Sequence, residues 1–186
     1  AILVGGGMAN SFLYALGKNI GKSLCEKDLK DVALKIIETA KQNNCEIILP
    51  NDVVVVKEFK ANADNRLASI DDIQDDEIIV DIGTQTIKNL DVKLNAFKTL
   101  VWNGPLGAFE MKPFNRGTED FANIVAKLTE AEKLISIAGG GDVVSAINGC
   151  NLASDFTYIS TAGGAFLEWL EGKELPGVSA LQNHKN

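Results

Sequence analysis

The residues with the clearest chemical potential are Gly139, Gly140, Gly141 and Asp142, which follow the short apolar run 134–138. An apolar run, three glycines and an acidic residue predict a strand, a tight turn and the start of a helix. Glycines without a Cβ let main-chain N–H groups approach an anion, and the first turn of a helix carries partial positive charge. This stretch is therefore typical of a phosphate site.

Asp142 leaves two interpretations open. A carboxylate at such a turn competes with phosphate for the N–H donors, unless a shared Mg²⁺ lies between the two. The alternative is that Asp142 caps the helix N-terminus and serves no ligand. The choice between these two interpretations depends on the residues elsewhere in the chain.

The pattern of strand, glycine turn and helix occurs three times. The other two turns contain Gly5, Gly6 and Gly7, and Gly163 with Gly164. Neither of the first two triple-glycine turns matches G-x-G-x-x-G, because the sixth position is Asn10 in one and Val144 in the other. A dinucleotide-dependent oxidoreductase domain is therefore not supported, and the turns predict a site for phosphates or a nucleotide.

Strand-like and helix-like segments alternate along the chain. We expect strands at 1–4, 46–49, 53–56, 67–70, 77–82, 99–102, 134–138 and 156–160, and helices at 8–16, 28–43, 84–95, 117–128, after 142 and up to 170. This order predicts an α/β fold, a Rossmann-like, mostly parallel sheet with helices on both faces in three layers, over a single domain 1–186. The glycine turns and the rigid loop Asn103–Glu110 would then meet at the sheet edge where ligands bind.

Composition narrows the range of partners. The chain has 186 residues, 46% of them apolar, and a net charge of −7, which opposes attraction to nucleic acid or an anionic membrane. No apolar run approaches the roughly 18 residues of a membrane span. Cys25, Cys45 and Cys150 lack metal-ligand spacing and predict buried thiols in a reducing compartment, so we expect a cytoplasmic protein.

Three other features favour structural explanations. The acidic cluster Asp71 to Glu77 lies in a predicted loop and is typical of a solvated face, not of a metal site. Segment 17–23 resembles a P-loop, but it has three residues between its glycines where four are needed, and a helix precedes it. His184, the sole histidine, is predicted to be solvated in the C-terminal tail.

Several segments, in the correct order, resemble motifs of the C-terminal, nucleotide-binding domain of the phosphoglycerate kinase family. They are Ile2–Leu13 (IxGGGMAxxFL), Ile20–Leu24 (IGxSL), Leu49–Asp52 (LPxD), Val101–Glu110 (VWNGPxGxFE), Phe114–Thr118 (FxxGT), Gly139–Asp142, Ser160–Ala165 and Leu170–Gly177. The resemblance covers essentially the whole chain. It implies a glycolytic kinase that transfers a phosphoryl group between 1,3-bisphosphoglycerate and ADP, giving 3-phosphoglycerate and ATP, with Mg²⁺, as a monomer in its full-length form.

The resemblance also implies roles for residues at matching positions. Gly5, Gly6, Gly7 and Leu24 would line the adenine slot, which Phe59 would extend. Asn103, Pro105, Leu106 and Gly107 would follow the ribose and phosphates, and Glu110 would bind the ribose hydroxyls. Gly139, Gly140, Gly141 and Asp142 would hold the β- and γ-phosphates, with Asp142 as the Mg²⁺ ligand and Val143 contributing its main-chain N–H. The main-chain N–H groups of Gly140 and Gly163 would lie against the transferring phosphoryl group.

The sequence departs from the family pattern at three positions. Val143 stands where the family usually has Thr or Ser, Ala162 replaces the first glycine of STGGG, and Thr84 replaces the proline of DxGP. In the family, an N-terminal domain and the first strand-helix unit of the C-terminal domain would precede the position of Ala1, and we expect this chain to be a fragment that lacks both.

We therefore expect a nucleotide-binding piece that is inactive alone, whose tail 173–186 would pack on that N-terminal domain. The alternative is a noncatalytic nucleotide-binding or interaction module that retains the fold.

Overall fold

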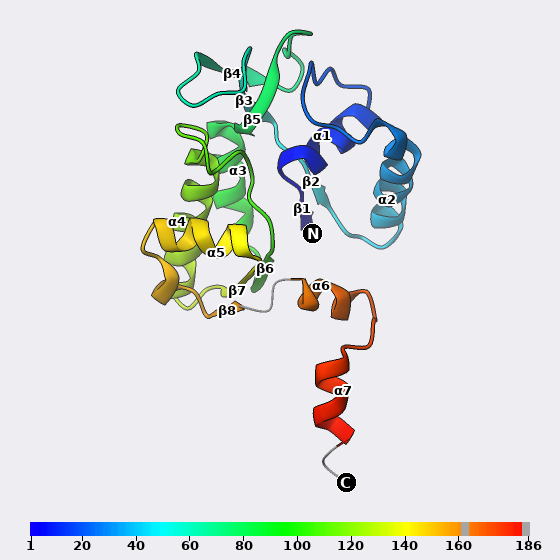
Figure 1. Ribbon diagram of the computed structural model, residues 1–186, viewed down its shortest axis with the longest axis vertical. Coiled ribbons are helices and arrows are strands. Elements are labelled where there is room, and N and C mark those ends of the chain that lie inside the picture. Colours follow the sequence, from blue (N-terminus) through cyan, green and yellow to red (C-terminus); the bar gives the residue numbers. More distant parts are fainter. Residues whose placement is uncertain (161–163, 184–186) are drawn as a thin grey trace.

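The computed structural model describes residues 1–160 and 164–183 (Figure 1). The strands are β1 Ile2–Leu3, β2 Ile47–Ile48, β3 Asp52–Val56, β4 Asn65–Ser69, β5 Ile78–Ile82, β6 Thr99–Trp102, β7 Ile135–Gly139 and β8 Tyr158–Ser160. The helices are α1 Gly6–Ala15, α2 Lys30–Gln42, α3 Thr84–Leu94, α4 Arg116–Glu130, α5 Gly141–Gly149, α6 Ala165–Leu170 and α7 Pro176–Asn183, with short 3₁₀ turns at Lys27–Leu29 and Ala153–Asp155. The predicted alternation of strands and helices, and with it the α/β class, is confirmed.

The parallel strands lie in two sheets and not in the one continuous sheet that the alternation predicts. β1 pairs with β2, and β6, β7 and β8 form a second parallel sheet in that order. Within the described residues no ladder joins β1 to β6. The parallel pairings themselves agree with the sequence, because each connection between neighbouring parallel strands contains a helix.

The third sheet is antiparallel and has the order β4-β3-β5. Its central strand contains four consecutive valines, and Val53, Val55 and Val56 are buried. β-Branched side chains suit such a position because they pack well on a pleated surface. The predicted strands 53–56 and 67–70 thus form an antiparallel hairpin, in which β4 pairs along its whole length with β3.

The main core lies between α3, α4 and the sheet of β6, β7 and β8. α4 presents Phe121, Ala122 and Val125 at helical spacing, and all three are fully buried. Trp102 is buried at the end of β6, with its ring edge-on to Phe121 at a centroid distance of 5.0 Å. This core fixes the carboxyl ends of β6 and β7, where the candidate site begins.

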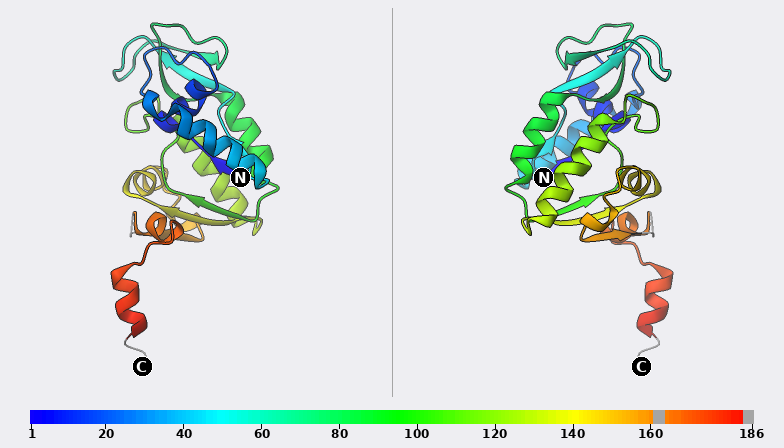
Figure 2. Two further views of the ribbon diagram at one scale, coloured as in Figure 1. Left: turned by 90° about the vertical axis from the view of Figure 1, so that its right-hand side faces the viewer. Right: turned by 90° about the vertical axis from the view of Figure 1, so that its left-hand side faces the viewer.

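The C-terminal segment differs from the irregular tail that the sequence suggests. α7 forms a helix that starts at Pro176, a residue that favours the first helical position because its φ is already set. The helix projects from the rest of the molecule in all three views (Figures 1 and 2). Its Val178 and Leu181 side chains are exposed. His184 lies outside the described residues.

Two further observations concern the classes of protein considered above. None of the helices in the described ranges is long and apolar enough to cross a membrane. The three cysteines are free thiols that are half-buried, so the prediction of fully buried thiols was wrong in degree.

Candidate functional site

The glycine turn after β1 lies directly against the loop that follows β6. A Cβ added to Gly5 would stand 2.9 Å from both the Cα and the Cδ2 of Leu106. Gly6 adopts a φ of +55° and donates its amide hydrogen to the carbonyl oxygen of Leu106, 3.2 Å away. The turn therefore needs glycine both for this conformation and for the close approach of two backbones.

Leu24 completes this corner of the predicted site. Its Cδ2 lies 3.1 Å from the position that a Cβ on Gly7 would occupy, and its carbonyl oxygen accepts a hydrogen bond from Asn10 Nδ2 at 3.1 Å. The Leu24 side chain is 78% exposed. An exposed apolar side chain beside a turn of glycines, which have no side chains, offers an apolar surface on which a planar ring can pack.

Phe59 stands apart from that corner in the sequence, in the segment after β3. Its ring is 54% exposed and so is free to meet a ligand. Its predicted place beside the adenine remains a prediction.

The loop that follows β6 also reaches the second glycine turn, at the end of β7. Gly140 has a φ of +89°, and a Cβ there would lie 3.2 Å from the carbonyl oxygen of Asn103 and 3.4 Å from its Oδ1. Asn103 is half-buried. The short segment from Asn103 to Leu106 thus bridges the turn after β1 and the turn after β7, which were predicted to meet. They meet through this loop and not through a shared sheet.

Asp142 lies in the first turn of α5, whose N-cap is Gly140. Its side chain is exposed and makes no capping hydrogen bond, so the interpretation of Asp142 as the helix cap was wrong. An exposed carboxylate beside uncapped N–H groups suits Mg²⁺, which takes one or two protein carboxylates together with phosphate oxygens and waters. The local geometry therefore fits the predicted metal ligand.

Three other predicted site residues differ in what the structure shows of them. The side chain of Val143 is fully buried in the main core, so only its main chain can face a ligand. Glu110 is exposed at the far end of the loop after β6, and its predicted contact with the ribose remains a prediction. Gly163 lies outside the described residues.

Two buried polar residues anchor the loop after β6, and the sequence reading did not single them out as site residues. Thr118 Oγ1 accepts the Leu106 amide hydrogen at 3.1 Å, and Asp81 Oδ2 accepts the Gly117 amide hydrogen at 2.7 Å. Burial raises the pKa of Asp81 to about 7, against the opposing effect of hydrogen bonds from the Gly117 and Ile82 amides. A lone carboxylate inside the apolar strand Ile78–Ile82 was the signal that could have revealed Asp81.

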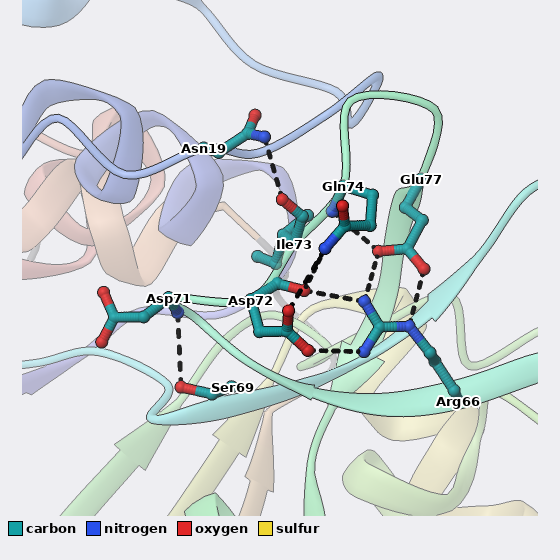
Figure 3. A network of polar contacts seen from close by, with 8 residues as sticks. All are labelled: Asn19, Arg66, Ser69, Asp71, Asp72, Ile73, Gln74 and Glu77. Carbon is teal, nitrogen blue, oxygen red and sulfur yellow. Dashed lines mark hydrogen bonds and ion pairs between the residues drawn. The ribbon is translucent and has the colours of Figure 1, made fainter.

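Two members of the acidic cluster, Asp72 and Glu77, are held by Arg66. Arg66 donates from Nε and Nη2 to the two carboxylate oxygens of Glu77 at 2.7 and 2.9 Å, and from Nη1 to Asp72 at 3.0 Å (Figure 3). Hydrogen bonds from Arg66 hold the pKa of Glu77 below its usual range. Glu77 is buried, so the prediction of a solvated face was wrong for that residue, whereas Asp71, Asp72, Asp75 and Asp76 are exposed. Among the described residues there is no group of three or more His, Cys, Asp or Glu side chains that could hold a metal ion.

The family model described as phosphoglycerate kinase matches residues 1–173. The chain belongs to the phosphoglycerate kinase family. It is 59% identical to the phosphoglycerate kinase of Xanthobacter autotrophicus over 181 residues, and 55% identical to that of Methylorubrum populi. These alignments cover 97% of this chain but 46% and 45% of the two relatives, so the chain spans about half their length.

Solved structures agree with this assignment. The phosphoglycerate kinase structure from Coxiella burnetii has a TM-score of 0.88 at 44% identity, covering 95% of this chain and 45% of that one. The phosphoglycerate kinase from Pyrococcus horikoshii has a TM-score of 0.75 at 28% identity, covering 97% of this chain and 44% of that one. The phosphoglycerate kinase fold of the chain is thereby confirmed.

Proposed function

We propose that this chain is the nucleotide-binding half of a phosphoglycerate kinase and binds ADP or ATP together with Mg²⁺. The observation that carries the proposal is the bridge formed by Asn103–Leu106 between the two glycine turns. One end of this bridge offers the apolar surface of Leu24, and the other offers the start of α5 with the exposed carboxylate of Asp142. An apolar slot at one end and main-chain N–H donors at the other suit the base and the phosphates of one nucleotide.

The site would supply some of the features that phosphoryl transfer requires from a protein. That reaction depends on positioning and on stabilising charge, with little covalent chemistry from side chains. The main-chain N–H groups of Gly140 and Gly141 would hold phosphate oxygens, and those of Gly140 and Gly163 would face the transferring group. Asp142 would hold the Mg²⁺ that accompanies the nucleotide, and the metal would offset the negative charge of the phosphates.

The reaction of the whole protein is part of the same proposal. The complete kinase would move a phosphoryl group between 1,3-bisphosphoglycerate and ADP, giving 3-phosphoglycerate and ATP, as a cytoplasmic monomer without nucleic-acid or membrane partners. The phosphoglycerate substrate would bind the family's N-terminal domain, and segment 173–186 would pack on that domain. We therefore expect the isolated chain to bind nucleotide without catalysing transfer.

The test is a calorimetric titration of the chain with ADP, with and without Mg²⁺, on wild type and Asp142→Ala. We expect Mg²⁺ to strengthen binding to wild type and to have little effect on the variant, because one carboxylate ligand is lost. Asp155→Ala is the matched control, since Asp155 is an acidic residue in a short 3₁₀ turn away from the glycine turns. Absence of ADP binding at millimolar concentration would overturn the proposal for this chain.

A coupled assay addresses catalysis separately. The isolated chain should show no ATP-dependent turnover of 3-phosphoglycerate. Measurable turnover that disappears in Asp142→Ala would disprove the expectation of inactivity and leave the nucleotide site intact as a proposal.

A further inference from the structure

Asp81 is a buried carboxylate that connects three elements of the site. It sits in the central part of β5, is 2% exposed, and accepts the amide hydrogens of Gly117 at 2.7 Å and of Ile82 at 2.9 Å. Gly117 belongs to the first turn of α4, so the carboxylate satisfies one of the N–H groups that the start of a helix leaves without a partner.

The same carboxylate also lies beneath the loop that follows β6. A Cβ on Gly107 would stand 2.3 Å from Asp81 Oδ1 and 2.7 Å from Asp81 Cα, so the loop crosses directly over this residue. One residue further on, the Ala108 amide donates to the carbonyl oxygen of Val80 at 2.7 Å. The loop is thus held against β5 at Val80 and Asp81.

The start of α4 holds the loop from the other side. Thr118 is fully buried, and its Oγ1 accepts the Leu106 amide hydrogen at 3.1 Å. Since Thr118 follows Gly117, the carboxylate that fixes the first turn of α4 also fixes the hydroxyl that holds Leu106. Leu106 in turn accepts the hydrogen bond from Gly6. A single side chain therefore sets the position of a backbone segment that touches both glycine turns.

We propose that Asp81 is a positioning residue for nucleotide binding: through Gly117 and Thr118 it holds the segment Asn103–Gly107 in the shape that joins the two glycine turns. The inference rests on the proposed nucleotide site, because Asp81 would act on a ligand only through the backbone of that segment. It adds to that proposal a residue on which the geometry of the site depends.

The chain contains a close counterpart that separates positioning from simple helix capping. Asp52, at the start of β3, accepts the amide hydrogens of Gln85 at 3.0 Å and Thr86 at 2.7 Å in the first turn of α3. Both aspartates thus reach from a strand to the start of a helix. The first turn of α3, however, carries none of the predicted nucleotide-binding residues, so Asp52→Asn removes the same kind of contact without affecting the loop after β6.

The experiment compares Asp81→Asn and Asp52→Asn by ADP titration with Mg²⁺, by urea unfolding, and by amide hydrogen exchange at Leu106 and Ala108. Asp52→Asn should lose stability, whereas the stability of Asp81→Asn relative to wild type should depend on pH, so all three measurements are made at one pH. Only Asp81→Asn should raise the Kd for ADP, by about tenfold or more, and only it should speed exchange at the two loop amides. Thr118→Val, which removes the acceptor for the Leu106 amide and leaves Asp81 in place, should reproduce both changes and serves if Asp81→Asn does not fold.

Equal effects of Asp81→Asn and Asp52→Asn on the Kd, after allowing for their stabilities, would overturn the inference. Unchanged exchange at Leu106 and Ala108 in both Asp81→Asn and Thr118→Val would do the same. If the wild-type chain binds no ADP, the proposed function fails, and the exchange rates alone decide whether Asp81 holds the loop.

Discussion

The amide nitrogen of Gly6 and the carbonyl oxygen of Leu106 lie 3.2 Å apart and form a hydrogen bond between two segments that follow strands of different sheets. β1 and β6 share no ladder in the described part of the chain, so the distance between the two glycine turns depends on contacts of this kind. The fit of Gly5 against Leu106 is the closest of them. Small changes at this contact should therefore alter the site more than they alter the core.

Gly5→Ala tests that relationship. The new Cβ would meet the Leu106 backbone at 2.9 Å, and backbone cannot rotate away as a side chain can. We expect a loss of about 1–3 kcal/mol in the free energy of unfolding, as for other overpacked positions, and weaker binding of ADP. Gly149→Ala is the matched control, because nothing lies within 4 Å of its added Cβ, and it should leave both the stability and the Kd near wild type. An unchanged Kd for ADP in Gly5→Ala would show that nucleotide binding does not depend on the close fit between Gly5 and Leu106.

Asp81 should make stability depend on pH in an unusual direction. Burial raises its pKa to about 7 from the ordinary 3.8, and the nearby charges of Asp120 and Glu119 act in the same direction. The folded chain therefore holds this proton more tightly than the unfolded chain. The stability that protonation contributes is fully present below about pH 4 and is lost as the pH rises to 7 and slightly above.

The measurement is urea unfolding of wild type and Asp81→Asn between pH 4 and 8. Wild type should lose stability relative to the variant as the pH rises, by up to roughly 4 kcal/mol. The difference should level off above pH 8. A constant difference across this range would mean that Asp81 has the same pKa in the folded and the unfolded chain.

Arg66→Met should destabilise the antiparallel sheet by leaving Glu77 as a buried carboxylate without its cation (Figure 3). Hydrogen bonds from Arg66 lower the pKa of Glu77 below 4.5. The stabilisation is therefore present above that pH and disappears as the pH falls through the lowered pKa. Urea midpoints at pH 7 and pH 3 should show a large loss at pH 7 and a smaller one at pH 3.

Lys57→Met is the control for Arg66→Met. Lys57 pairs with Asp76 at 3.0 Å, but both side chains are largely exposed, and such pairs contribute little. Equal losses in the two variants would show that the burial of Glu77 does not matter.

The sequence was sufficient to predict the elements whose patterning is local. The valines of β3, the helical spacing of Phe121, Ala122 and Val125 in α4, and the glycines at the ends of β1 and β7 each specify their own segment. It also predicted that Gly5, Leu106 and Asn103 would contribute to one site. The phosphoglycerate kinase family itself was predicted from motifs and is confirmed.

The features that could not be predicted depend on which distant segments pair. Nothing local in Ile2–Leu3 indicates that it pairs with β2 and remains separate from β6. The partner of Glu77 is Arg66 on another strand, so the burial of this carboxylate could not be predicted from its acidic neighbours. Asp81 falls in the same class, because its role depends on the first turn of α4 and on Gly107, which are far away in the sequence.

Val143→Thr tests whether the departure from the family pattern at this position weakens nucleotide binding. The Val143 side chain is fully buried among apolar residues, so a threonine hydroxyl there has to find a hydrogen-bond partner or remain unpaired. We expect a loss of about 1–3 kcal/mol in stability and no gain in ADP affinity. Val144→Thr, at the half-buried next position of α5, is the control and should cost less. Tighter ADP binding by Val143→Thr than by wild type would show that the hydroxyl reaches the phosphates, and that the first turn of α5 rotates this side chain toward the ligand when nucleotide is bound.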